Sequence, residues 1–338
     1  MQIRNQAELE DLLTRPSHED IQAARKFGGD VLILGAAGKI GPSLAIRIKR
    51  AIRQAGLSHR VIAVVRKDRD VFAGHADGID VVEADLLNSG AWRGLPDASN
   101  VVFMVGRKFG STGDQPLTWA TNVLVAGLAA DRFRNSRIIV FSTGNVYPFM
   151  PVDGPGARET TPPAPTGEYA QSALGRERIF EYFSNAFGTR VLIYRLNYAV
   201  DLRYGVLVDI GQQVLKGEPI SVETGYANVI WQGDANSYCL RAFHLSGSPA
   251  RILNVTGQKT ISVREMAQRF GRRFGKEPRI VGRESPTALL SDASDCIATL
   301  GPPKIDENDL FEMAAEWLGR GGETLGKPTK FESRDGKF

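Results

Sequence analysis

Residues 30–41 read Asp-Val-Leu-Ile-Leu-Gly-Ala-Ala-Gly-Lys-Ile-Gly. The first five form a short apolar run, which is typical of a buried parallel strand. Gly35 permits a tight turn, Gly38 lets the backbone approach a pyrophosphate, and Gly41 lets the next helix pack close to the strand. The N-terminus of that helix offers unpaired N–H groups to phosphates. The order of strand, glycine loop and helix predicts a dinucleotide site, and a simple strand–helix turn is the alternative.

The rest of the chain alternates between strands and helices. We expect a long helix at residues 117–133 and further strands at residues 61–65, 79–82, 101–105, 137–141 and 190–195. This order favours the α/β class, with a Rossmann-type doubly wound parallel sheet. We predict a helical extension (1–29), a dinucleotide-binding Rossmann domain (30–197), and a smaller substrate-binding lobe with a polar tail (198–338). Some segments of the lobe are expected to return to the Rossmann core.

Composition excludes several functional classes. The 338-residue chain carries a net charge of +4 without a basic stripe, so we expect no nucleic-acid partner. Cys239 and Cys296 lie far apart in the sequence, which favours a reducing compartment without disulfides. No apolar run is long enough to cross a bilayer and the N-terminus lacks a hydrophobic signal core, so we predict a cytoplasmic protein without a membrane partner. The histidines show no ligand spacing, so we expect no protein-bound metal.

A tyrosine opens the helix that follows a proline-rich loop at residues 148–166. This is Tyr169, and the residue four positions later on the same helix face is Ala173. A lysine there would hold cofactor ribose hydroxyls and lower the pKa of the tyrosine through its charge. Two interpretations stay open: oxidoreductase chemistry with another support for Tyr169, or a protein that has lost this chemistry.

The joint order of the motifs resembles the extended short-chain dehydrogenase/reductase family of NAD-dependent epimerases and dehydratases, over about residues 30–275. Besides the glycine loop, the resemblance rests on Ala84-Asp85-Leu86, Asn122-Val123, the segment 142–147, Tyr169 with Ser172 and Glu177, Arg195-Leu196-Asn197, Asp234, Asn254-Val255 and the segment 262–265. The family's dehydratases place an Asp-Glu pair after the threonine. Gly144 and Asn145 stand there in this chain, so dehydration is not expected.

The resemblance implies that hydride moves between a substrate C–H and a nicotinamide, with Tyr169 as acid/base and Thr143 orienting the substrate oxygen. The alternatives are that Tyr169 only packs on the proline-rich loop and that the Thr143 hydroxyl only forms hydrogen bonds with the backbone. The expected cofactor contacts are Gly35, Gly38, Lys39, Ile40, Gly41, Arg66, Asp85, Leu86, Val105 and Tyr169. The expected substrate contacts are Arg107, Lys108, Asn145, Asn197 and Arg203, and the lobe adds Tyr204, Trp231 and Gln232 as lining candidates.

Two questions about charge remain open in the sequence. The second strand ends in Arg66 and Lys67, which favours the 2′-phosphate of NADP over NAD, although Asp68 folded back onto the ribose would favour NAD. Arg176, Arg107 and Lys108 are candidates for the missing cation, and each is equally compatible with a solvated surface charge.

The predicted function is therefore that of an NAD(P)-dependent oxidoreductase or epimerase with a small hydroxylated, sugar-like or sugar-acid substrate. The alternative is a non-catalytic NAD(P)-binding or regulatory protein. A homodimer is compatible with the sequence.

Overall fold

A parallel sheet organises the N-terminal two thirds of the chain. Its strand order is β12–β7–β5–β4–β1–β2–β3, and every pairing is parallel. The strands are β1 Val31–Leu34, β2 Val61–Val65, β3 Asp80–Glu83, β4 Asn100–Phe103, β5 Arg137–Thr143, β7 Arg190–Leu196 and β12 Arg251–Val255. The computed structural model describes residues 3–72 and 78–338. The expected Rossmann-type doubly wound sheet is confirmed, and β12 returns to it from beyond residue 197.

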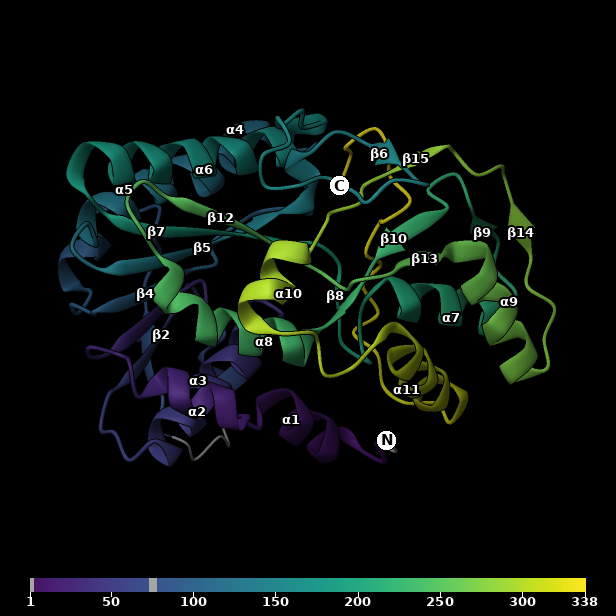
Figure 1. The fold of residues 1–338 in the computed structure, drawn as a ribbon, viewed down its shortest axis with the longest axis horizontal. Helices are drawn as coiled ribbons and strands as arrows, with labels where there is room; N and C mark the ends of the chain where they lie inside the picture. Colours follow the sequence, from purple (N-terminus) through teal and green to yellow (C-terminus); the bar gives the residue numbers. More distant parts are fainter. Residues whose placement is uncertain (1–2, 73–77) are drawn as a thin grey trace.

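Helices cover both faces of the sheet (Figure 1). Because side chains of a strand alternate between faces, Val31 and Ile33 pack with α3 (Gly41–Gln54) and α8 (Gln232–Arg241). Leu32 and Leu34 pack with α5 (Val125–Arg132) and α6 (Gly167–Phe187) on the opposite face. The apolar run of β1 is therefore buried on both sides, as a parallel strand requires.

The helix expected at residues 117–133 is interrupted. It consists of α4 (Gln115–Trp119), a π-helical turn (Ala120–Leu124) and α5. Asn122 lies in the π-helical turn and is fully buried. Its side chain accepts from Arg107 N at 2.7 Å and donates to Arg107 O at 3.1 Å and to Ser172 Oγ at 2.8 Å. The single turn of π-helix thus places an amide that joins the end of β4 to α6.

The N-terminal extension forms two helices, α1 (Gln6–Thr14) and α2 (His18–Ala24), that pack on α3 and α8. Asp20 of α2 is fully buried and forms an ion pair with Arg47 of α3 at 2.7 Å. Its other carboxylate oxygen accepts from Ser237 of α8. The extension therefore connects the helix that follows the glycine loop to a helix from the second half of the chain.

The lobe is built around α7 (Val206–Lys216), α9 (Val263–Phe274) and α11 (Glu307–Gly319), which share an apolar core. Four two-stranded pairs complete it: β8 Ala199–Val200 with β11 Ile230–Trp231, β9 Ile220–Ser221 with β14 Ile280–Val281, β10 Tyr226–Asn228 with β13 Thr260–Ser262, and β6 Met150–Pro151 with β15 Thr287–Ala288. The short helix α10 (Ser294–Leu300) packs instead beside β12, with Cys296 and Leu300 in the core of the sheet. In residues 3–72 and 78–338, no helix is long and apolar enough to cross a membrane.

Residues 320–338 form an irregular tail that runs back from α11 toward β6 and β15, between the sheet and the lobe (Figure 1). Asp209 of α7 accepts from Thr329 N at 2.8 Å and from Thr329 Oγ1 at 2.6 Å. Phe331 is buried in the core of the lobe, and Arg334 donates to Thr287 O at 2.7 Å. The tail is thus fixed at several points along its length.

Candidate active site

The glycine loop has the geometry that its spacing predicts. Gly35 has φ +82°, and a Cβ there would lie 3.0 Å from Val105 N. A Cβ on Gly41 would lie 2.2 Å from Ala36 O, so the backbone of α3 needs a glycine at this point. A Cβ on Gly38 would meet nothing closer than Gly35 O at 3.5 Å. Gly38 therefore presents an open backbone face, which suits close approach of a phosphate.

The N-terminus of α3 is also available to a ligand. The N-cap residue, Ile40, provides no side-chain hydrogen bond to the first turn. The first N–H groups of a helix have no partner within the helix, and their partial positive charge attracts anions. Because the loop and the helix end lie together, the residues present fit the diphosphate of a dinucleotide.

A cavity of about 640 Å³ lies at the C-terminal ends of β1, β2, β3 and β4. Its lining includes Gly35, Gly38, Lys67, Asp68 and the predicted cofactor contacts Arg66, Asp85, Leu86 and Val105. Arg107 also lines this cavity, and among the predicted substrate contacts only Lys108 lines it as well. Its backbone N–H donates to Asn122. Ligands of open α/β sheets bind at this edge of the sheet, so the cavity suits the adenosine half of a cofactor.

A second cavity, of about 330 Å³, adjoins the first. Six residues line both of them: Gly35, Gly38, Met104, Gly106, Lys108 and Phe109. The second cavity also brings together Lys39, Ile40, Thr143, Asn145, Tyr169, Arg176, Asn197 and Tyr204. An extended ligand across the glycine loop would therefore have one end near the C-terminus of β2 and the other beside Tyr169.

Tyr169 and Thr143 come from neighbouring elements. Thr143 ends β5, and its hydroxyl donates to Asn145 Oδ1 at 2.9 Å while accepting from Asn145 N at 3.2 Å. Tyr169 lies in the first turn of α6. Desolvation raises the pKa of Tyr169, and this effect outweighs the charge of Arg176 and the hydrogen bond with Thr143, which both lower it. The phenol is therefore the dominant form at neutral pH.

Arg176 lies two helical turns beyond Tyr169 and is buried, with 5 % of its surface exposed. Its Nη1 donates to Phe141 O at 2.7 Å, and its Nε donates to Asn122 O at 3.4 Å. Ala173, between the two, is fully buried against Val146 and Tyr147. The alanine thus belongs to a small apolar cluster, while the arginine reaches the cavity.

Two lysines, Lys108 and Lys39, line the second cavity. Lys108 Nζ donates to Thr329 O of the tail at 3.1 Å, and it lies 4.4 Å from the centroid of the Phe338 ring. Desolvation lowers the pKa of Lys108 to about 8. Although Lys39 is exposed along its length, its ammonium group lies over the Tyr204 ring, and desolvation there lowers its pKa to about 7.

Several predicted site residues have structural contacts that keep them from the cleft. Arg203 is paired with Asp201 at 2.6 Å and with Glu10 of α1 at 2.5 Å, and it lines neither cavity. In the segment Arg195-Leu196-Asn197, the arginine is buried in an ion pair with Glu177 at 2.6 Å, and only the other two residues face the cavity. Trp231 and Gln232 are buried in the protein interior.

Several contributors to the cleft were not indicated by the sequence, and three of them adjoin the predicted catalytic residues or come from unexpected segments. These three are Tyr198 and Thr329, which line the second cavity, and Phe338, whose ring contacts Tyr169. Tyr198 has positive φ (+45°), and nothing in its neighbourhood in the sequence signals this. The two tail residues belong to a polar, glycine-rich segment without periodicity, so no pattern connects them to the site.

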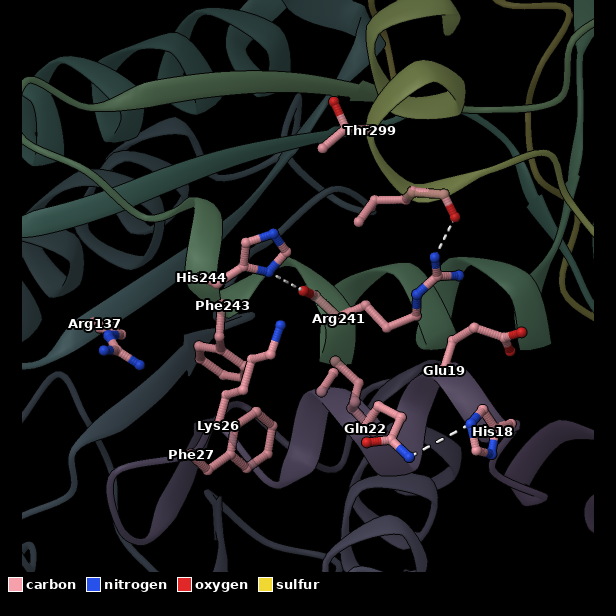
Figure 2. A pocket seen from close by; sticks show the side chains of 13 residues that line it. His18, Glu19, Gln22, Lys26, Phe27, Arg137, Arg241, Phe243, His244 and Thr299 are labelled. Carbon is pink, nitrogen blue, oxygen red and sulfur yellow. Dashed lines mark hydrogen bonds between the residues drawn. The ribbon is translucent and has the colours of Figure 1, made fainter.

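A separate cavity of about 260 Å³ lies on the α2 and α8 side of the molecule (Figure 2). Phe27 and Phe243 contact each other in its lining, which also includes Arg137 at the start of β5. Arg241 donates to Leu300 O, and His244 Nδ1 lies 2.7 Å from Arg241 O. This cavity is near the N-terminal end of a strand and so does not adjoin the glycine loop. Among the described residues, no group of His, Cys, Asp and Glu could hold a metal ion.

Comparisons with known proteins agree with this geometry. The model of the NAD dependent epimerase/dehydratase family matches residues 31–200. No curated protein matches the chain. Similar solved structures include the UDP-glucose 4-epimerase of Thermus thermophilus in complex with NAD, with 20 % identity, a TM-score of 0.69, and coverage of 86 % of this chain and 99 % of that one.

Two further structures have the same fold. An epimerase of Methanothermobacter thermautotrophicus is 15 % identical, with a TM-score of 0.74 and coverage of 91 % of this chain and 99 % of that one. The dTDP-glucose 4,6-dehydratase of Bacillus anthracis str. Ames, in complex with NAD, is 15 % identical, with a TM-score of 0.70 and coverage of 87 % and 97 %. The NADP preference expected from Arg66 and Lys67 receives no support from these NAD complexes.

Proposed function

This chain belongs to the NAD-dependent epimerase/dehydratase family, and we propose that it is an NAD(P)-dependent oxidoreductase or epimerase for a small hydroxylated substrate of sugar-like or sugar-acid type. One observation carries the proposal. Tyr169 and Thr143 line the same cavity as Gly38, so a proton-transferring group and a hydroxyl adjoin the phosphate-binding loop. This is the arrangement that hydride transfer coupled to proton transfer requires.

The residues have separate roles in this proposal. The cofactor, when bound, accepts or returns the hydride at its nicotinamide ring. Thr143 holds the substrate oxygen, and Tyr169 takes the hydroxyl proton during oxidation and returns a proton during reduction. An epimerase would carry out both steps and return hydride to the opposite face of the same carbon. Gly35 and Gly38 would hold the diphosphate, with Gly41 packing α3 close to the loop and with Asp85 and Leu86 on the adenosine side.

The size of the second cavity supports a small substrate. It has about 330 Å³ for the nicotinamide end of the cofactor and the substrate together. On the lobe side, Thr329 lines it, and Phe338 covers the ring of Tyr169. The fixed tail therefore favours an unlinked sugar or sugar acid over the UDP-glucose named for one similar structure. Lys108 supplies a cation that suits the carboxylate of a sugar acid.

NADP and NAD remain alternatives for the cofactor. Arg66 and Lys67 line the first cavity and suit a 2′-phosphate, while the similar structures contain NAD. Asp68 follows them with φ +63° and lines the same cavity, where a carboxylate suits the ribose hydroxyls of NAD. We retain NADP as the candidate to test against NAD.

A non-catalytic dinucleotide-binding protein is the second candidate function. The observation in its favour is Ala173, which is packed in an apolar cluster where the family's lysine would stand. Such a protein would bind the cofactor and show no turnover with any substrate.

The decisive experiment is a screen of aldoses, polyols and sugar acids with NAD and NADP, followed through cofactor absorbance. Product analysis of the same reactions by NMR detects epimerisation, which leaves the absorbance unchanged. The Tyr169→Phe variant is the control, since it keeps the ring and removes the hydroxyl. Turnover that disappears in this variant supports the enzyme. Cofactor binding without turnover in any reaction favours the second candidate, and absence of cofactor binding overturns both.

A further inference from the structure

The position of Arg176 on α6 is the starting point. It follows Tyr169 by seven residues, which is close to two full turns of an α-helix. The two side chains therefore project from the same helix face, and both line the second cavity. The missing lysine would have stood between them at Ala173. Because Arg176 lies about one turn beyond Ala173 on α6, its side chain must be longer than that of a lysine at position 173 to bring a positive charge to the same place. An arginine side chain is longer than a lysine side chain.

The guanidinium group of Arg176 is held without being neutralised. Its two hydrogen bonds inside the protein go to the backbone carbonyls of Phe141 and Asn122. In the described part of the chain, no carboxylate forms an ion pair with it. The adjacent carboxylate, Glu177, is already paired with Arg195 at 2.6 Å and 2.9 Å. The positive charge of Arg176 is therefore available to the phenol of Tyr169.

One nitrogen of Arg176 has no partner among the residues that the structure describes. Its Nη2 is buried, and it makes no hydrogen bond with them. A buried donor without an acceptor is costly, and such groups in native proteins commonly await a ligand or a water. A Cβ on Gly106 would lie 2.9 Å from this nitrogen, so Nη2 sits directly over Gly106. Gly106 lines both cavities, at the point where a dinucleotide would pass from one to the other.

We propose that Arg176 replaces the absent lysine: its charge supports the phenolate of Tyr169, and its free Nη2 donates to a hydroxyl of the ribose next to the nicotinamide. The assignment rests on the proposed cofactor site and goes beyond it, because it names a residue two turns from the tyrosine. Lys108 is the rival candidate, because its ammonium group lies 6.0 Å from the centroid of the Tyr169 ring. It differs from Arg176 in being held by the tail, through Thr329 O and the Phe338 ring, and Arg176 is the cation whose charge acts on the Tyr169 phenol.

Three variants distinguish the effect of the positive charge at position 176 from the effect of the length of the side chain there. Arg176→Met removes the charge and keeps a long side chain, and Arg176→Lys keeps the charge on a shorter one. Arg178→Met is the matched control, because Arg178 is on the same helix but exposed and paired with Glu181. The midpoint of thermal unfolding identifies any variant that does not fold. Gly106→Ala is the additional variant, since its Cβ displaces Nη2 without changing any charge.

The first readout is the titration of residue 169 itself, without substrate or turnover. A fluorinated tyrosine incorporated at position 169 reports its own ionisation by 19F NMR. Removing a cation from beside a phenol raises its pKa by about one unit or more. We expect this rise in Arg176→Met, a smaller rise in Arg176→Lys and none in Arg178→Met. A folded Arg176→Met protein with an unchanged titration overturns the charge assignment.

The second readout is the affinity for NAD and NADP by calorimetry. Loss of a hydrogen bond from a charged donor weakens binding about tenfold or more. We expect this loss in Arg176→Met and in Gly106→Ala, and no change in Arg178→Met. Unchanged affinity in both of the first two variants overturns the ribose contact. If the unaltered protein binds neither dinucleotide, the proposed function fails, whereas the 19F titration still tests the charge of Arg176.

Discussion

The ring of Phe338 packs edge-on against the ring of Tyr169, with centroids 5.5 Å apart and planes at 79°. The contact joins the end of the tail to the first turn of α6. It is reinforced by a hydrogen bond from Gly110 N to Phe338 O at 3.1 Å. Phe338 is itself buried, so the tail removes one side of Tyr169 from water.

Phe338→Ala should therefore lower the pKa of Tyr169, because water that reaches the phenol favours its charged form. This lowering of the Tyr169 pKa is opposite in sign to the rise expected for Arg176→Met. The 19F titration of residue 169 measures it, with Leu325→Ala as the control, since Leu325 is an exposed residue of the same tail. A pKa that stays the same or rises in Phe338→Ala would show that the tail does not shield the phenol.

Gly38→Val should abolish dinucleotide binding and leave the fold intact. The space at Gly38 accepts a side chain, but that side chain would occupy the face that the diphosphate approaches. Gly41→Ala is the contrasting variant, because its Cβ would clash with Ala36 O and cost about 1–3 kcal/mol of stability. Calorimetry and thermal unfolding distinguish the two. Undiminished affinity in Gly38→Val contradicts the assignment of the loop.

Arg66→Ala should weaken the binding of NADP about tenfold or more and leave that of NAD unchanged, because a charge-assisted hydrogen bond to the 2′-phosphate is lost. Arg93→Ala serves as a control at a basic residue that lines neither cavity. Calorimetric titrations with both dinucleotides test the expectation. NAD binding that is tighter than NADP binding in the unaltered protein, and indifferent to Arg66, rules out the NADP preference.

Oxidation should become faster toward alkaline pH. The base is the phenolate, and burial raises the pKa of Tyr169 above its ordinary value of 10.0. Below that pKa, the phenolate fraction rises about tenfold for each pH unit, and the rate should follow while the protein stays folded. Rates of Tyr169→Phe should be low and nearly independent of pH. A rate that is flat in the unaltered protein between about pH 7 and pH 9 would assign proton transfer to another group.

Asp20→Ala should lower the free energy of unfolding by about 3–5 kcal/mol, because it leaves the buried guanidinium of Arg47 without its partner. Chemical denaturation measures this loss. Asp11→Ala, which removes an exposed partner of Arg15 on α1, should cost at most about 1 kcal/mol. A loss of about 1 kcal/mol or less in Asp20→Ala would show that the buried pair with Arg47 contributes little to stability.

The sequence predicted the sheet and the glycine loop because both depend on local patterns. The apolar run of β1 and the spacing of three glycines each determine the backbone that they form. The sequence could not choose among Arg176, Lys108 and Arg107, since the reach of a long side chain depends on its neighbours. In the structure, the first of these donates to Phe141 O and lines the same cavity as Tyr169, while the second donates to Thr329 O of the tail.

The candidate substrate residues were harder to predict than the cofactor loop. Asn197 and Arg203 both follow β7 and looked equivalent in the sequence. Asn197 faces the cavity, but Arg203 pairs with Glu10, which lies in a helix 193 residues earlier in the chain. Such a long-range partner has no signature in the local sequence. The assembly state also stays a prediction, and light scattering on the purified protein would test the homodimer.

The extension has a consequence for the route by which ligands reach the cleft. Asp20 joins α3 to α8, and Glu10 holds Arg203 beside the start of α7. The first contact lies within the helical layer on one face of the sheet, and the second fastens that layer to the lobe. The tail, by contrast, borders the cleft itself, because Lys327 lines the first cavity and Thr329 lines the second. We therefore expect cofactor and substrate to exchange past residues 327–338, with the release of this segment setting the pace of exchange.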